Sequence, residues 1–320
     1  MSWKKKLATG TALAALTAGA VYIVNKYIYF MATLNDFLSK PKGNYYEWRF
    51  GKFFYTKKGS GSPILLVHDL TSASSGYEWN RIEETLSHTN TVYTIDLLGC
   101  GRSDKPNITY TNFLYVQLVT DFIKHIIGKR TDVITTGYSS SFVLAACAND
   151  TNIINKLILT NPSDLSEIAK IPTKRTKALK ALLNTPLVGT LLYNVLMIRK
   201  NIETLFQTNY FYNSDEIMSQ YVNVYYEAAH TCNSKPKYLF ASMKGRFTNF
   251  NMTHCLKLIN NSIFIITGNG NPENLVSAQC YKEHIPSIEI VPMNKTNHLP
   301  QIEDPNAYLE HIKILFEIEE

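Results

Sequence analysis

The chain has 320 residues, of which 45% are hydrophobic, and its formal net charge is +6 at pH 7. This length and apolar content suffice for one large folded domain. Lysine and arginine are scattered rather than gathered in a stripe, which argues against a nucleic-acid-binding protein. The five cysteines show neither a Cys-x-x-Cys motif nor a metal-ligand spacing, so we expect reduced side chains and no metal site. We expect no organic cofactor either.

The first predicted element is an apolar helix that follows Lys4, Lys5 and Lys6. Residues 7–25 carry no charge. As a helix they would extend about 28 Å, close to the roughly 30 Å hydrocarbon thickness of a bilayer. A cleavable signal peptide is the alternative, because Ala18-Gly19-Ala20 resembles a small-x-small cleavage site. We favour an uncleaved anchor, since the apolar character continues to Met31.

The lysines around this helix bear on its orientation. The cluster at Lys4 to Lys6 favours a cytoplasmic N-terminus by the positive-inside tendency, which predicts a single-pass protein of the cell membrane with its domain outside the cytoplasm. Lys26, Lys40 and Lys42 place positive charge on the other flank as well, and the unpaired cysteines would also suit a cytoplasmic domain.

Beyond the anchor, short strands alternate with helices. Tyr45–Ser62 has the turns of a leading hairpin, and two buried strands follow within Ser62–Leu70 and Thr91–Pro106. Apolar residues at four-residue spacing within Thr111–Ile127 predict a helix that ends at Gly128. Such alternation is typical of a mostly parallel sheet flanked by helices.

The most informative segment is TDVITTGYSSS, residues 131–141, which precedes a helix-like sequence. An apolar strand that runs through Gly-x-Ser-x-small into a helix is the pattern of a nucleophile elbow, in which a serine is exposed at a tight turn. Ser139 is therefore the candidate nucleophile. An ordinary Gly-Ser turn is the alternative, because such turns are frequent in α/β proteins.

About a hundred residues separate the predicted strand Lys156–Thr160 from the strand Ser262–Ile266. They are rich in leucine and aromatic residues at helical spacing, which predicts a helix-rich insertion. Its composition favours an apolar acyl or alkyl group in the substrate, although these side chains could equally serve only to hold the insertion together. A last strand lies within Ile288–Pro305, and Asp304 and Pro305 are suited to begin the final helix.

From Tyr45 to Glu320 the chain resembles the α/β-hydrolase family. The resemblance rests on the elbow and on two further motifs in the family's order: Asp-x-x-Gly-x-Gly-x-Ser, matched by Asp96, Gly99, Gly101 and Ser103, and a histidine before Leu-Pro and Glu-x-Pro, matched by His298, Leu299, Pro300, Glu303 and Pro305. It implies an α/β-hydrolase fold with a helical cap inserted late in the sheet. The expected division is residues 1–33 as anchor, 34–164 as first part of the core, 165–256 as cap and 257–320 as second part of the core.

The resemblance also implies roles for particular residues. Ser139 would attack a carbonyl after His298 removes its proton, and the amides of Leu70 and Ser140 would stabilise the oxyanion. This mechanism requires Ser139 Oγ and His298 Nε2 to lie roughly 2.6 to 4 Å apart.

Two family positions are altered. Asn271 stands where the family has the acid that orients the histidine. Either its uncharged amide oxygen accepts from His298 Nδ1, or Asp164 or Glu273 replaces the acid and contacts that atom. Asp69 replaces the glycine of the oxyanion loop, whereas His68 is expected to have a structural role there. An ionised Asp69 aimed at the oxyanion site would oppose the reaction, so it must point away, be protonated or serve another purpose.

These observations leave two hypotheses. The first is a membrane-anchored serine hydrolase that acts on an ester, thioester or amide of an apolar acid. The second is a pseudo-hydrolase that binds a ligand or partner in its capped pocket. Asn271 and Asp69 favour the second hypothesis, but the retained Ser139 and His298 favour the first, and the serine hydrolase is the interpretation that we prefer from the sequence.

Overall fold

The computed structural model describes residues 3–39, 42–213 and 216–318. Its centre is an eight-stranded sheet in the order β1-β2-β4-β3-β5-β6-β7-β8. The first two strands form the predicted hairpin, β2 pairs antiparallel with β4, and the pairs from β4 onward are parallel. The strands are β1 (Asn44–Trp48), β2 (Gly51–Lys58), β3 (Ser62–Val67), β4 (Asn90–Ile95), β5 (Thr131–Thr136), β6 (Ile154–Thr160), β7 (Ser262–Gly268) and β8 (Glu289–Met293).

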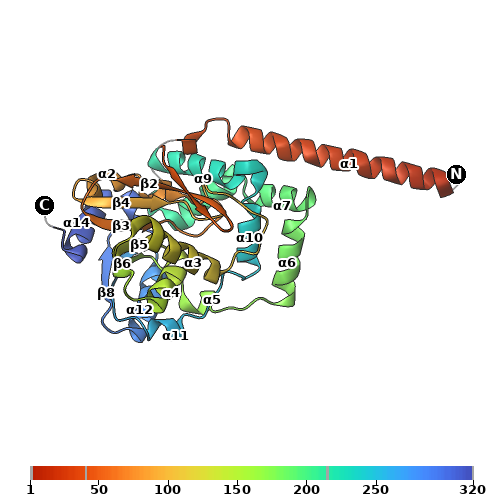
Figure 1. Cartoon of the computed structure of the whole chain (residues 1–320). Helices are drawn as coiled ribbons and strands as arrows, with labels where there is room; N and C mark the ends of the chain where they lie inside the picture. The colour runs from red at the N-terminus through yellow and green to blue at the C-terminus, as the bar shows by residue number, and fades with distance from the viewer. Residues whose placement is uncertain (1–2, 40–41, 214–215, 319–320) are drawn as a thin grey trace.

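Helices cover both faces of this sheet (Figure 1). Successive strand residues point to opposite faces, so Leu65 and Val67 pack with α3, α4 and α12, whereas Ile64 and Leu66 pack with α2 and α14. The core helices are α2 (Glu83–Leu86), α3 (Asn112–Phe122, continued by a π-helix over Ile123–Ile127), α4 (Ser139–Asn149), α12 (Pro272–His284), α13 (Pro300–Glu303) and α14 (Pro305–Phe316).

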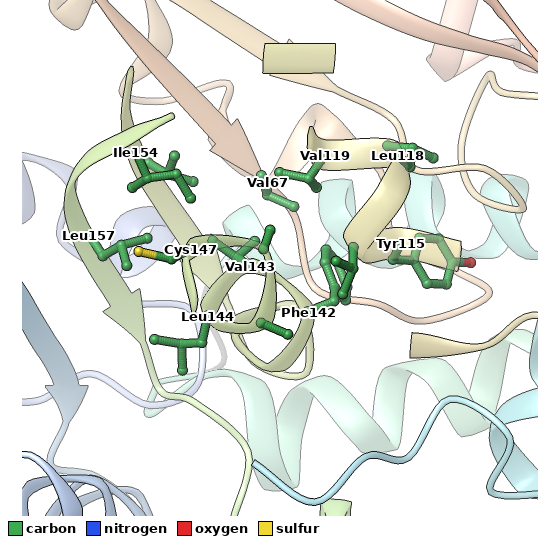
Figure 2. Packing of buried hydrophobic residues seen from close by; sticks show 14 of the residues in the cluster. Val67, Tyr115, Leu118, Val119, Phe142, Val143, Leu144, Cys147, Ile154 and Leu157 are labelled. Atoms are coloured by element: carbon green, nitrogen blue, oxygen red, sulfur yellow. The ribbon is translucent and has the colours of Figure 1, made fainter. Parts of the chain in front are cut away.

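Helix α4 is the best buried of these helices, and it fixes the turn that precedes it. Phe142, Val143 and Leu144 are fully buried. Figure 2 shows the helix enclosed by side chains of α3 and of strands β3 and β6, among them Val119 and Leu157. Because apolar side chains surround α4 on several sides, its N-terminal turn is held rigidly at the end of β5.

The cap lies between β6 and β7, where the sequence predicted an insertion. Its helices are α5 (Leu165–Ile168), α6 (Lys174–Asn184), α7 (Val188–Leu196), α8 (Arg199–Leu205, continued by a π-helix over Phe206–Tyr210), α9 (Glu216–Ser234), α10 (Lys237–Lys244) and α11 (Thr253–Leu256). The hydrophobic cluster within the cap includes Phe206 and Tyr225 and extends to Leu299 of the core. This architecture confirms the predicted α/β-hydrolase fold with a late helical cap.

The N-terminal helix α1 (Trp3–Ala32) extends away from the body of the molecule, and its C-terminal part contacts α7 and α9 (Figure 1). Within it, Thr11–Ala32 is long and apolar enough to cross a membrane by length and composition. Side chains such as Leu13, Leu16 and Ile23 are more than half exposed in this structure. These features are consistent with a membrane anchor and equally with a signal sequence.

The short segment that follows α1 in the chain contacts the cap. The backbone amides of Phe37 and Leu38, in a 3₁₀ turn (Phe37–Ser39), donate hydrogen bonds of 2.7 and 3.2 Å to the carboxylate of Glu227 in α9. Glu227 is only 2% exposed, and Leu38 packs against Val224 and Ala228. The connection is therefore fixed to the cap by both polar and apolar contacts.

Candidate active site

The tight turn after β5 is centred on Gly137, not on Ser139. Gly137 has a φ of +57°, in the left-handed region, whereas Tyr138 is right-handed with a φ of −65° and Ser139 is already the first residue of α4. In a nucleophile elbow the exposed residue occupies the sharp strand-to-helix turn. The family's nucleophile position is thus occupied by a glycine, and the predicted register is wrong by two residues.

The carboxylate of Asp69 fills the space that a side chain at Gly137 would occupy. A Cβ atom built on Gly137 would lie 2.5 Å from Asp69 Cγ, which is closer than real contacts allow. Asp69 follows β3, and its Oδ1 accepts a 2.7 Å hydrogen bond from the amide of Tyr138. Its Oδ2 lies 3.1 Å from His298 Nε2. An acidic side chain from a neighbouring loop therefore lies where a nucleophile would project.

Ser139 lies away from this carboxylate–imidazole pair. It is fully buried, and its Oγ donates a 2.6 Å hydrogen bond to the backbone carbonyl of His68. The predicted Ser139–His298 contact is replaced by the contact between His298 and Asp69.

The predicted oxyanion donors are affected by the same shift in register. The amide of Ser140 is directed to the carbonyl of Gly137 within the helix turn, at 3.3 Å. The amide that follows the turn belongs to Tyr138, and it binds Asp69. Leu70 is buried in the loop after β3.

His298 is held between the core and the cap. Its side chain is 20% exposed, and its ring stacks on Tyr210 with centroids 4.9 Å apart and an interplanar angle of 23°. The side-chain amide of Asn161 donates a 3.0 Å hydrogen bond to the carbonyl of His298, and the carboxylate of Glu303 accepts from the amide of Asn297. These contacts fix the loop and aim Nε2 at Asp69.

The three candidates for the orienting group all cap or begin helices instead. Asn271 accepts a 3.0 Å hydrogen bond from the amide of Glu273 at the N-terminus of α12. Asp164 accepts from the amides of Ser166 and Glu167 at the start of α5, and Glu273 is exposed in the first turn of α12. The expectation that Asp164 or Glu273 orients His298 is therefore wrong. The carboxylate of Asp164 binds the first amides of α5, and the side chain of Glu273 is exposed in the first turn of α12. The carboxylate that contacts the ring in the described part of the chain is Asp69.

A second buried carboxyl group, Glu78, lies beside Asp69. It accepts hydrogen bonds from the amide of Asp69 at 3.0 Å and from the hydroxyl of Tyr225 at 2.6 Å. Burial, together with the negative charge of Asp69, raises the pKa of Glu78 to about 8. Near neutral pH, Glu78 is thus mainly protonated, and the pair carries about one negative charge rather than two.

His68 has the structural role expected for it. Its Nδ1 lies 2.7 Å from the carbonyl of Asp69, and its Nε2 accepts a 3.0 Å hydrogen bond from the amide of Leu97. Burial lowers the pKa of His68. The ring is accordingly neutral, with its proton on Nδ1, and it connects the loops that follow β3 and β4.

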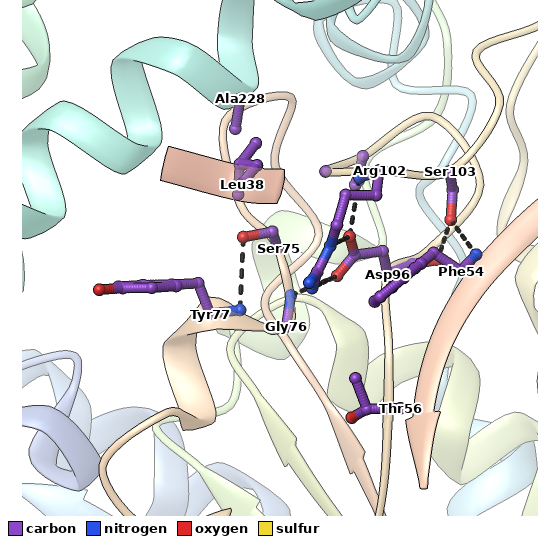
Figure 3. Close-up of polar contacts among 12 residues, drawn as sticks. Leu38, Phe54, Thr56, Ser75, Gly76, Tyr77, Asp96, Arg102, Ser103 and Ala228 are labelled. Atoms are coloured by element: carbon purple, nitrogen blue, oxygen red, sulfur yellow. Dashed lines mark hydrogen bonds and ion pairs between the residues drawn. The ribbon is translucent and has the colours of Figure 1, made fainter. Parts of the chain in front are cut away.

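The loop after β4 keeps all the family residues and is also structural (Figure 3). Asp96 accepts hydrogen bonds from the amide of Gly76 and from the amide and guanidinium of Arg102, at 2.7 to 3.0 Å. Burial opposes ionisation, but Arg102 outweighs it, and the pKa of Asp96 falls to about 2. Ser103 donates to the carbonyl of Asp96 and accepts from the amide of Phe54. The motif thus orders the loop beside the site.

A cavity of about 330 Å³ lies over the site, between core and cap. Three of its lining residues contact site groups: Tyr138 binds Asp69, Tyr210 stacks on His298 and Tyr225 binds Glu78. The remaining lining is mainly apolar and comes from α8, α10 and the loop after β3: Thr71, Ser72, Ala73, Met197, Ile202, Leu205, Phe240, Met243, Lys244 and Thr248. Across residues 3–39, 42–213 and 216–318 no cluster of three or more His, Cys, Asp or Glu side chains suits a metal ion.

The sequence contained one signal for the correct register. Small residues flank Gly137 in the same way as they flank Ser139, since Thr135 and Ser139 lie two residues before and after it. Asp69 was recognised as unusual, but its partners were not, because they come from distant segments. Glu78, Tyr210 and Tyr225 had no motif that would have identified them.

Comparison with known proteins agrees with this fold. The profile of the family described as "Alpha/beta hydrolase family" matches residues 64–311. The chain is 26% identical over 113 residues to 2-hydroxy-6-oxo-6-(2'-aminophenyl)hexa-2,4-dienoic acid hydrolase of Metapseudomonas resinovorans, which covers 35% of this chain and 39% of that protein. It is 38% identical over 63 residues to haloalkane dehalogenase of Agrobacterium fabrum, which covers 19% of this chain and 20% of the relative. The chain thus aligns with about two fifths or less of these relatives.

A solved structure extends the similarity to the N-terminal helix. The crystal structure of a membrane phospholipase A, described as a bacterial virulence factor, superimposes with a TM-score of 0.67 and 17% identity and covers 98% of both chains. At this identity the likeness concerns the fold alone. Since the family profile spans most of the chain and the sheet and cap have the matching architecture, this protein belongs to the α/β-hydrolase family.

Proposed function

We propose that this protein is a membrane-anchored member of the family that binds an apolar ligand under its cap and does not perform acyl transfer through a serine. The observation that carries the proposal is the pair formed by Gly137 and Asp69: the turn has no side chain, and a carboxylate fills its place. The proposal corresponds to the pseudo-hydrolase hypothesis, and the missing nucleophile side chain at Gly137 is its physical support.

Acyl transfer needs a nucleophile and donors for a developing oxyanion. Here the amide of Tyr138, which would be such a donor, is already bonded to Asp69. An ionised Asp69 also repels a second negative charge at this place. His298 Nε2, which would accept the proton of a serine, is bonded to Asp69 as well. The nucleophile of the serine mechanism is thus absent, and its base and one of its oxyanion donors are occupied.

The cavity supports the ligand class. Met197, Ile202, Leu205, Phe240 and Met243 supply most of its wall, and burial of an apolar chain against them would release ordered water. Tyr138, Tyr210 and Tyr225, which contact Asp69, His298 and Glu78, place polar groups in the part of the wall beside the site. A fatty acyl or alkyl chain with a small polar head matches this distribution.

A fluorophosphonate probe tests the loss of serine chemistry. We expect the full chain in detergent to give no adduct on Ser139 by mass spectrometry. The variant Gly137→Ser/Asp69→Gly/Asn271→Asp restores the family residues at three positions, and it should acquire an adduct on the new serine. An adduct on Ser139 in the unaltered protein would overturn the proposal.

The membrane anchor can be tested separately. We expect the full chain in the membrane fraction and a chain that lacks residues 1–33 in the soluble fraction. The lysine cluster at Lys4 to Lys6 supports an outward-facing domain, so protease added to intact cells should digest it. Protection of the domain, alongside digestion of a known exposed protein, would reverse the orientation.

A second candidate function uses Asp69 itself as nucleophile. It is favoured by the arrangement of the carboxylate, with Oδ1 bound to a backbone amide and Oδ2 beside His298. Attack of Oδ2 on an electrophilic carbon would form an ester and expel a leaving group. A water molecule that loses its proton to His298 would then attack the ester carbonyl, which releases an alcohol and regenerates the carboxylate. The haloalkane dehalogenase relative makes alkyl halides suitable substrates for the test.

Isotope labelling separates this candidate from the binding protein. After turnover of an alkyl halide in H₂¹⁸O, the peptide that contains Asp69 should gain ¹⁸O, and Asp69→Asn should abolish halide release. If no halide is released and no label is incorporated, the carboxylate is not a nucleophile for this class and the binding role stands.

A further inference from the structure

A second cavity lies between the N-terminal helix and the cap, and it shares no lining residue with the cavity over Asp69. It has a volume of about 300 Å³, and three lysines line it: Lys26 of α1, Lys235 after α9 and Lys237 of α10. None of its lining residues is acidic. The site is therefore positively charged and lacks a counter-ion among its own walls.

Lys237 is the most informative of these lysines. It is only 4% exposed, and its ammonium donates to the carbonyl of Thr185 at 2.9 Å and to the hydroxyl of Thr190 at 2.8 Å. An ammonium group has three donors, so one remains for a ligand in the cavity. A buried cation without an anion is costly, and a bound anion would offset this cost.

The opposite wall is organised around the end of α9. Cys232, Asn233 and Ser234 all have left-handed backbone with φ between 53° and 59°, although none is a glycine. This run directs the side chain of Asn233 to Lys26, whose ammonium it accepts at 2.7 Å. Lys26, which belongs to the anchor helix, is thereby held in the wall of the cavity by the end of α9.

An apolar groove of about 440 Å³ continues from this cavity along α1. Leu187 lines both spaces, so they adjoin. The groove runs past Leu13, Thr17 and Val21 on one side and is closed by Val188 on the other. From Tyr22 back to Leu13 the helix rises about 14 Å, which is the length of a substantial part of an acyl chain.

We propose that the α1–cap groove binds one anionic phospholipid of the surrounding membrane. The phosphate is bound by Lys26, Lys235 and Lys237, and an acyl chain lies along the face of α1 that carries Leu13 and Val21. Charge complementarity and the adjoining apolar groove select this occupant, because a soluble anion would leave the groove unfilled. The site rests on the membrane-anchor part of the proposed function but not on the role of Asp69.

Native mass spectrometry of the full chain in mixed micelles tests this site. Phosphatidylglycerol and phosphatidylcholine with the same acyl chains are the probes, and we expect one phosphatidylglycerol to be retained at least about tenfold more tightly. Lys237→Met should remove this preference, whereas Lys200→Met, which removes the same charge from an exposed position of the cap, should keep it. Equal losses in both variants would show general surface attraction and overturn the proposal.

Two further measurements keep the test decisive. Ala18→Phe fills the apolar groove without altering the lysines, and it should weaken retention of both lipids if the chain lies there. If inorganic phosphate displaces phosphatidylglycerol at low millimolar concentration, the site takes free phosphate and the lipid assignment is wrong. Because the micelle assay requires neither a spanning helix nor the cavity over Asp69, its failure is distinguishable from failure of the proposed function.

Discussion

The loops that follow β4 and β5 lie at the same end of the sheet, on either side of β3, but they differ in what they keep of the family pattern. The loop after β4 keeps Asp96, Arg102 and Ser103, and each polar atom there is bonded mainly to backbone or to a neighbour in the loop. The turn after β5 keeps its shape but has Gly137 at the place of a nucleophile. Motifs that hold the scaffold can thus persist where residues that would react have changed, so intact loop motifs are weak evidence for activity.

The largest expected effect on stability concerns the loop after β4, which keeps the family residues. Asp96→Asn would leave the Arg102 guanidinium partly buried without its charge partner and weaken the loop's amide bonds. We expect the free energy of unfolding to fall by about 3 to 5 kcal/mol. Asp104→Asn alters an exposed carboxylate of the same loop that accepts from Lys52, and it should cost less than about 1 kcal/mol. Denaturant unfolding in detergent measures both. Similar losses would mean that the loop does not depend on the buried ion pair.

The pair of carboxyl groups predicts a pH dependence near neutral pH, whereas the lowered pKa of Asp96 in the loop after β4 acts only at acidic pH. The pKa of Glu78 is raised by burial and by Asp69 from 4.5 to about 8, so the folded state binds a proton more tightly than the unfolded chain. The stability from this group is present at low pH and lost as pH rises through this window. Between pH 6 and 7.5 we expect a loss of about 2 kcal/mol.

Glu78→Gln removes the titrating group but keeps a carbonyl oxygen as acceptor, so it should flatten this part of the stability profile. Glu84→Gln is the matched control, because Glu84 is 74% exposed. Denaturant unfolding at a series of pH values measures the slope. An unchanged slope in Glu78→Gln would assign the titration to another group.

A double-mutant cycle tests whether Asp69 occupies the place of a side chain at Gly137. Gly137→Ala adds a Cβ that meets Asp69 and forces alanine into left-handed backbone, so we expect a loss of about 1 to 2 kcal/mol. Asp69→Gly should relieve the steric part, and the two substitutions together should cost less than the sum of the single changes. Strict additivity would mean that Asp69 does not occupy the side-chain place of Gly137.

The smallest effect concerns the cap. Tyr210→Leu removes the ring that stacks on His298. A cycle with His298→Leu should show a coupling of about 0.5 to 1 kcal/mol in unfolding free energy. No coupling would indicate that the cap and the histidine loop are energetically independent.

The fold was predictable because it depends on local patterns. Alternating strands and helices, the leading hairpin and the cap at Asp304 are all encoded in short segments, and the structure has them. Apolar periodicity also located the insertion between β6 and β7. Such features require no knowledge of which distant side chains meet.

The site was only partly predictable. His298 and the unusual Asp69 were identified, but the motif around Gly137 and Ser139 fits two registers, and only the backbone angle at Gly137 distinguishes them. Asn271 stands at the acid position, yet its orientation follows from capping of α12, which competes with any contact to the histidine. Contacts between loops, such as Glu78 to Asp69, depend on the assembled sheet.

The hydrogen bonds from Phe37 and Leu38 to Glu227 make the connection between the anchor helix and the domain rigid rather than flexible. A flexible tether would let the domain sample many heights and rotations above a bilayer. A rigid connection removes those degrees of freedom, so that a helix embedded in lipid would hold the cap at one height and in one rotational orientation about the membrane normal. Ligand entry would then become a two-dimensional encounter, in which molecules that diffuse laterally meet the cap in a single orientation.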